Sequence, residues 1–259
     1  MDLGIKGRTA LLTASSRGLG KACAVALARE GVDVTINGLS EENLETTAEE
    51  IRSATGVRVT AISADINTPD GRSELLAACP TPDILVNNNW GPPPGDWQSF
   101  EYDDWLSAIE SNMLAPIMMI RAVIEEMKRR RFGRIVNITS QMVKSPFSVM
   151  GLSAGARTGL TAACKALSRE VAQYNITINN LLPERIDTER SVYMAKRQAE
   201  ASGTTYAEAR QQIVNSIAAK RLGRPEELGA ACAFLCSVPA SYISGQNLQL
   251  DGGSYRGTF

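Results

Sequence analysis

A glycine-bearing loop near the N-terminus is the first segment of this sequence that could bind a ligand. It reads TASSRGLG and lies between a predicted strand, residues 8–13, and an alanine-rich helical pattern, residues 18–30. Glycines at a helix start serve plain packing in many proteins, but after a strand they let backbone amides approach a pyrophosphate. The loop therefore predicts dinucleotide binding. We expect its contacts to come from Thr13, Ser15, Ser16, Arg17, Gly18, Leu19 and Gly20.

The end of the second predicted strand, residues 32–37, bears on the choice of cofactor. An acidic residue there would accept the ribose hydroxyls of NAD, but the segment Asn37-Gly38-Leu39-Ser40 contains none. Arg17 could pair with a 2′-phosphate, because a guanidinium matches phosphate geometry, or it could be a solvated surface charge. We expect NADP(H) rather than NAD(H), with Asn37 among the cofactor-binding residues.

The sequence contains no histidine. This excludes Ser-His-Asp and Cys-His nucleophile systems and removes the commonest metal ligand. Five cysteines form no CxxC pair, and Cys23, Cys164 and Cys232 fall among helical alanines and leucines, as buried thiols do. We expect no metal site, and acid–base chemistry must use other groups.

Alternating strand and helix patterns predict the elements that position these residues. The expected strands are residues 8–13, 32–37, 57–62, 84–87, 134–139, 177–182 and 247–250. This order predicts an α/β Rossmann fold with one seven-stranded parallel sheet and helices on both faces, which binds ligands at the carboxyl ends of its strands. No repeat or linker divides the chain, so we expect one domain over residues 1–259, with a lid-like helical insertion at about 187–220.

The bulk composition fits a globular protein that binds a small molecule. Hydrophobic residues are 44% and charged residues 21% of the 259 residues, and the net charge is −1. That charge gives no general attraction to nucleic acid or to an anionic membrane. The short apolar run at the N-terminus is too brief for a signal peptide or a membrane span, so we expect a cytoplasmic protein.

Several motifs in order resemble one family over nearly the whole chain. TASSRGLG looks like TGxxxGxG, residues 87–90 (NNNW) stand where NNAG usually stands, and GRIVNITS ends in Ser140. Further on, NITINNLLPERIDT resembles GITVNxxxPGxxxT, and RLGRPEE, YISGQ and LDGG follow. The chain thus resembles the short-chain dehydrogenase/reductases, especially the 3-oxoacyl-[acyl-carrier-protein] reductases, and the resemblance implies an oxidoreductase.

The resemblance also assigns site residues. It implies cofactor contacts from Asp65, Ile66, Asn88, Asn89, Arg157, Pro183, Ile186 and Thr188. It implies a catalytic set of Asn112, Ser140, Ser153 and Arg157.

The resemblance breaks at the reacting centre. Gapless alignment from Ser140 and from Pro183 puts the family's YxxxK pair on Ser153 and Arg157. Three glycine positions are also changed, to Ala14, Trp90 and Glu184. The chain is similar to a divergent reductase-like subgroup with the same GPPPG loop and SxxxR pattern.

These substitutions change the expected chemistry. The family's tyrosine protonates the carbonyl oxygen, and its lysine lowers the pKa of that phenol. A serine hydroxyl is shorter and far less acidic, and arginine is a poor proton relay although it keeps the charge. A replacement acid could be Tyr193, Lys144 or Glu184, or these could be a packing residue, a solvated charge, and a partner of Arg185 or Arg190.

Three functions remain open on the sequence. The first is an NADP(H)-dependent oxidoreductase acting on a small carbonyl or hydroxyl compound, of 3-oxoacyl type by resemblance. The second is a non-redox lyase or isomerase with Arg157 clamping an anion, and the third is a catalytically silent ligand-binding protein. The predicted helix at residues 102–131 carries apolar residues such as Met113, Met118 and Met119. The resemblance implies that such helices pair in a homotetramer.

Overall fold

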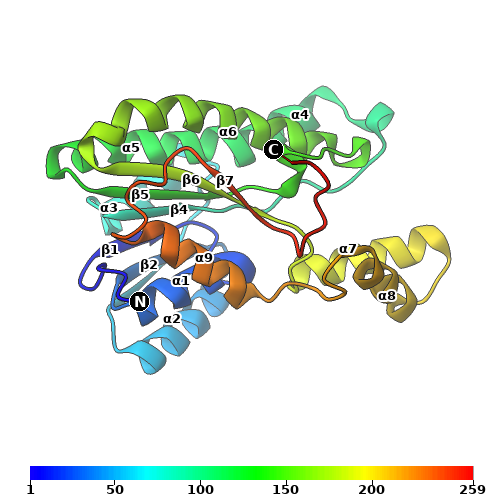
Figure 1. Cartoon of the computed structure of the whole chain (residues 1–259), viewed down its shortest axis with the longest axis horizontal. Helices are drawn as coiled ribbons and strands as arrows, with labels where there is room; N and C mark the ends of the chain where they lie inside the picture. Colours follow the sequence, from blue (N-terminus) through cyan, green and yellow to red (C-terminus); the bar gives the residue numbers. More distant parts are fainter. Residues whose placement is uncertain (259) are drawn as a thin grey trace.

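The computed structural model describes residues 1–258, which form one seven-stranded sheet at the centre of the molecule (Figure 1). All neighbouring strands pair in parallel, in the order β3-β2-β1-β4-β5-β6-β7. The strands are β1 (Thr9–Leu12), β2 (Asp33–Gly38), β3 (Val59–Ser63), β4 (Ile84–Asn87), β5 (Gly133–Ile138), β6 (Ile176–Pro183) and β7 (Asn247–Leu250). The predicted parallel sheet is confirmed, and its strand order reverses between β1 and β4, where such sheets bind ligands.

Helices cover both faces of the sheet, as a parallel sheet requires. Figure 1 shows α1 (Gly18–Arg29), α2 (Glu41–Thr55) and α9 (Pro225–Cys236) on one side. On the other side lie α3 (Pro69–Ala78), α4 (Tyr102–Ile109), α5 (Ala115–Arg130) and α6 (Gly151–Val171). Alternate residues of β1 supply the two cores: Leu12 packs with the first set of helices and Leu11 with the second.

Local signals explain where these helices begin and end. The Ser40 hydroxyl caps α2 by accepting a hydrogen bond from the Asn43 amide, and α2 ends at Gly56 in the left-handed region (φ 71°). The Thr68 hydroxyl caps α3 in the same way, and Pro69 follows at the first helical position. These signals are readable in the sequence, so most of the fold was predictable from it.

The helical run predicted at residues 102–131 is divided in the structure. A π-helical turn, Glu110–Leu114, separates α4 from α5 and buries Asn112. By length and composition the run Tyr102–Arg130 could also span a membrane, but residues such as Met119, Val123 and Met127 pack against the sheet. One face of α5 is therefore buried against the sheet, as in a core helix.

Two further helices stand beside the carboxyl ends of the strands. They are α7 (Glu189–Ser202) and α8 (Tyr206–Ser216), drawn in yellow at the right of Figure 1. Each begins with a capping box, at Thr188 with Ser191 and at Thr205 with Glu208. They occupy the segment predicted as a lid-like insertion at about 187–220.

Candidate functional site

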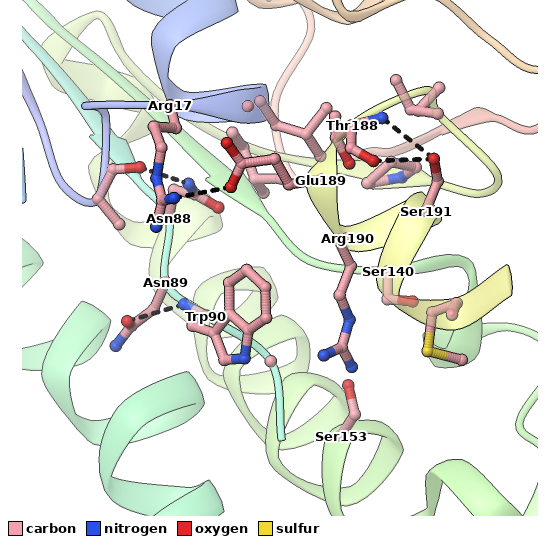
Figure 2. Close-up of a pocket in the computed structure, with 18 of the residues that line it drawn as sticks. Arg17, Asn88, Asn89, Trp90, Ser140, Ser153, Thr188, Glu189, Arg190 and Ser191 are labelled. Carbon is pink, nitrogen blue, oxygen red and sulfur yellow. Dashed lines mark hydrogen bonds and ion pairs between the residues drawn. The ribbon is translucent and has the colours of Figure 1, made fainter. Parts of the chain in front are cut away.

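A cavity of about 460 Å³ opens at the carboxyl ends of the strands (Figure 2). Its walls come from the loops after β1, β2, β3, β4, β5 and β6 and from residues of α6, α7 and α8. The volume lies within the range of small-molecule sites. The cavity is therefore the candidate active site.

The loop after β1 curls tightly onto the start of α1. Ala14 has φ 42°, a left-handed conformation that glycine adopts more easily, and Gly18 has φ 56°. A Cβ added to Gly20 would collide with the Ala14 carbonyl. Gly20 thus lets the start of α1 pack closely on the loop, an arrangement that presents helix-start amides to a pyrophosphate.

Buried hydrogen bonds fix this loop against β2 and β4. The Thr13 hydroxyl donates to the Asn88 carbonyl at 2.7 Å, and the Asn88 side chain donates to the Ala14 carbonyl at 2.9 Å. The Ser15 hydroxyl donates to the Leu12 carbonyl and accepts from the Asn37 amide. Thr13, Ser15 and the packed Gly20 lie outside the cavity lining, and they shape the loop from behind.

The other sequence-predicted cofactor residues do line the cavity. They are Ser16, Arg17, Gly18, Leu19, Asn37, Asp65, Ile66, Asn88, Asn89, Arg157, Pro183, Ile186 and Thr188. The Asn37 side-chain amide donates to the Ile62 and Ala64 carbonyls, so it joins strand ends and has no N–H left for a ribose. Arg17 forms a 2.8 Å ion pair with Glu189 of α7 (Figure 2).

Two side-chain hydrogen bonds join the loop after β4 to the π-helical turn. The Asn89 side chain donates to the Ser111 carbonyl at 2.8 Å, and the Asn112 side chain donates to the Trp90 carbonyl at 3.3 Å. Asn112 is buried outside the cavity lining, and its Oδ1 atom has no partner within residues 1–258. Asn112 is therefore linked to the cavity through the carbonyl of Trp90, a residue that does line the cavity.

Ser140, Ser153 and Arg157 meet at one end of the cavity. Ser140 follows β5, and its Oγ accepts from the Met142 amide at 3.2 Å. Ser153 and Arg157 are one turn apart on α6, so Arg157 Nε donates to Ser153 Oγ at 3.2 Å. Each hydroxyl accepts one hydrogen bond and donates none within the described chain, which leaves both O–H groups available to a ligand.

Arg157 is held against the end of β5. Its Nη1 donates to the carbonyls of Ile138 and Thr139 at 2.8 and 2.9 Å. Burial, and to a smaller extent the positive charge of Arg190, lowers the pKa of Arg157 to about 10. The side chain is thus a fixed cation at neutral pH, because this pKa still lies well above 7.

The three groups considered as replacement acids all lie outside this cavity. The Tyr193 hydroxyl accepts from Arg197 at 3.2 Å, and Lys144 Nζ donates to Gln249 at 3.4 Å. Glu184 lines a second, smaller cavity beside Asp251, and burial raises its pKa. No tyrosine or lysine lines the main cavity among the residues that the structure describes.

The structure adds a residue that the sequence reasoning missed. Arg190 was considered only as a partner of Glu184, but Glu184 faces Arg185 at 3.9 Å, and Arg190 enters the main cavity. Its guanidinium lies 5.1 Å from the ring centroids of both Trp90 and Tyr193. The only sequence signal was its place two residues after Thr188, where the predicted insertion begins.

Comparison with known proteins agrees with this architecture. Residues 13–255 match the family model described as enoyl-(acyl carrier protein) reductase. The chain is 32% identical to the NADPH-dependent reductase BacG of Bacillus subtilis, over 96% of this chain and 98% of that protein. It is 29% identical to the 3-oxoacyl-[acyl-carrier-protein] reductase FabG of Vibrio cholerae, over 98% and 99% of the two chains.

A solved structure extends the likeness to the backbone. L-sorbose reductase from Gluconobacter frateurii, complexed with NADPH and L-sorbose, superposes with a TM-score of 0.93 at 28% identity, over 99% of this chain and 100% of that one. The chain belongs to the short-chain dehydrogenase/reductase family of oxidoreductases.

Proposed function

We propose that this protein is an NADP(H)-dependent oxidoreductase that interconverts a small carbonyl compound and its alcohol at the Ser140, Ser153 and Arg157 end of the cavity. The observation that carries the proposal is the pair of serine hydroxyls, each with a free O–H, beside a buried cation. Such donors stabilise charge that develops on a substrate oxygen.

The preference for NADP(H) rests on charge at the end of β2. Residues 37–40 carry no carboxylate that would repel a 2′-phosphate, and Arg17 lies in the adjoining loop. The relatives point the same way, since BacG is an NADPH-dependent reductase and the sorbose reductase binds NADPH. The nicotinamide, when bound, supplies or accepts the hydride.

The protein's own groups then act on the substrate oxygen. The Ser140 and Ser153 hydroxyls donate hydrogen bonds to that oxygen and orient the carbonyl. Arg157 donates from Nε to Ser153 Oγ, which makes the Ser153 O–H a stronger donor. The Arg157 charge also favours the developing alkoxide. The proton that this alkoxide takes up comes from solvent, because no phenol lines the cavity within residues 1–258 and a serine hydroxyl is far less acidic.

The test is NADPH oxidation with a panel of ketones and oxo acids, with the product identified. Ser153→Ala is expected to lower kcat by about 100-fold, the usual cost of losing one such donor. Ser148→Ala, an exposed serine just before α6 and outside the cavity, is the matched control and is expected to keep full activity. Equal rates for Ser153→Ala and the wild type would contradict the assigned role.

The absence of tyrosine and lysine from the described cavity lining favours one alternative. A lyase or isomerase would need only the clamp that Arg157 provides. Product formed without NADPH oxidation would identify this alternative. Ligand binding with neither product nor oxidation would identify a catalytically silent protein.

A further inference from the structure

Five arginines line the cavity, and they differ in whether a carboxylate neutralises them. Three have an acidic partner, in the pairs Arg17–Glu189, Arg185–Glu184 and Arg210–Asp187. The other two, Arg157 and Arg190, have none within residues 1–258. An unneutralised cation in a cavity is costly, so these two are the ones that an anionic ligand would stabilise.

Arg157 has one donor group left for a ligand. Only 8% of the residue is exposed, and Nε and Nη1 are bonded to Ser153 and to the carbonyls of Ile138 and Thr139. Nη2 makes no hydrogen bond in the described chain. It faces Gly91, where an added Cβ would lie 3.3 Å from it. The glycine leaves the space in front of Nη2 open.

Arg190 supplies the second charge from the opposite wall. Its guanidinium is fixed by Trp90 and Tyr193 and by a 2.9 Å hydrogen bond from Nη2 to the Pro92 carbonyl. Figure 2 shows the side chain reaching from the start of α7 toward Ser153. Nε and Nη1 of Arg190 have no acceptor among residues 1–258. Two guanidinium groups with free N–H donors thus converge beside the serine hydroxyls.

We propose that the substrate carries a carboxylate, bound between Arg157 and Arg190 next to the carbonyl or hydroxyl that reacts. The position of the reacting group rests on the proposed function, whereas the anion site does not. The phosphates of NADP(H) would lie at the other end, on the loop after β1. Met150, Met194 and Trp90 also line the cavity, so an oxo or hydroxy acid with an apolar body fits it.

The anion site can be tested by binding alone. Titration calorimetry would compare 3-phenylpropanoate with the neutral 3-phenylpropanamide, on the full chain with and without NADPH. We expect the acid to bind at least about tenfold more tightly, because a carboxylate on a guanidinium forms charge-assisted hydrogen bonds. In Arg190→Gln and Arg157→Gln this preference is expected to disappear.

Arg197→Gln is the matched control. Arg197 is an exposed arginine of the same helix that also contacts Tyr193, but it lies outside the cavity lining. It is expected to keep the preference for the acid. Arg190 is only half-buried, so its variant should fold even if the buried Arg157→Gln does not, and thermal melts would show this.

The outcomes separate this proposal from the redox function. Equal Kd values for acid and amide, no binding of the acid at millimolar concentration, or a preference that survives Arg190→Gln would overturn the anion site. Reduction of 2-oxo-3-phenylpropanoate but not of its methyl ester would support it. An Arg190-dependent preference without any NADPH oxidation would keep the anion site and reject the redox function.

Discussion

Ser153 and Arg157 together offer chemistry that differs from that of a phenol and an amine. A serine hydroxyl does not titrate in the physiological range, so its value here is as a directed hydrogen-bond donor. The bond from Arg157 Nε at 3.2 Å sets the direction of that donor and adds positive charge beside it. In the proposed reaction the pair would therefore stabilise an oxyanion without relying on a group that ionises near neutral pH.

Glu184 yields a prediction about stability. Burial raises its pKa above the ordinary 4.5, and its Oε2 atom has no partner within the described residues. The protonated carboxyl therefore stabilises the fold fully below 4.5, and this contribution is lost as pH rises through the raised pKa. Glu184→Gln stays neutral, so its Tm is expected to exceed that of the wild type at neutral pH and to match it near pH 4, within about one degree.

Thermal melts across this pH range would check the prediction. Glu200→Gln, an exposed glutamate of α7, is the control and is expected to show no pH-dependent difference. A Glu184→Gln variant that is less stable at neutral pH would show instead that the carboxylate forms a favourable pair with Arg185.

The sequence did not show in which direction every side chain near the site points, and this limited what could be predicted about the site. Ser140, Ser153 and Arg157 were placed by motif spacing along a strand end and one helix face, and the structure brings them to one end of the cavity. Motif spacing did not show which cavity the side chains of Glu184 and Arg190 enter. The chain between them passes through Arg185 in the left-handed region (φ 55°), which turns Glu184 to the second cavity and Arg190 to the first.

At the scale of elements, strands were predicted better than the helices that depend on tertiary contacts. Each predicted strand overlaps the observed one, because short apolar or alternating runs between helical segments are a local signal. The π-helical turn at Glu110–Leu114 was missed. It places the Asn112 side chain under the Trp90 carbonyl, a contact between distant segments that no local pattern encodes.

The carboxyl end of β2 predicts how cofactor preference can be reversed. Leu39 is 73% exposed and lines the cavity, so Leu39→Asp would put a carboxylate beside the expected 2′-phosphate site. Repulsion is expected to weaken NADPH binding by about tenfold or more and to improve NADH binding. Fluorescence titration with both cofactors would measure this. Leu39→Asn, which adds no charge, should change the ratio of the two Kd values much less.

The ion pair between α7 and the loop after β1 predicts a substitution that strengthens NADPH binding. The Arg17–Glu189 pair is more than half exposed on both sides, so it contributes little stability and opens readily. Glu189→Gln frees Arg17 and removes a negative charge near the cofactor phosphates, so NADPH is expected to bind several-fold more tightly. Weaker NADPH binding in Glu189→Gln would mean that the pair holds α7 in the binding conformation.

At the scale of the whole molecule, α4 carries apolar side chains away from the sheet. Leu106 is 46% and Tyr102 75% exposed, and Trp97, in the turn before α4, is 52% exposed. The homotetramer stays a prediction. Exposed apolar patches mark contacts between chains, and this surface is the one that we expect the tetramer to bury. Sedimentation at micromolar concentration is expected to give a tetramer, and Leu106→Lys a smaller species. A wild-type monomer would contradict the prediction.

The most direct test of the redox centre is a single-turnover measurement with NADPH deuterated at the hydride-donating C4 position. We predict deuterium in the alcohol product, at a rate that is flat between about pH 6 and 9 and falls as Arg157 loses its proton near its pKa of about 10. Product without deuterium, or a rate controlled by a group that titrates near neutral pH and is unchanged in Ser153→Ala, would contradict the account.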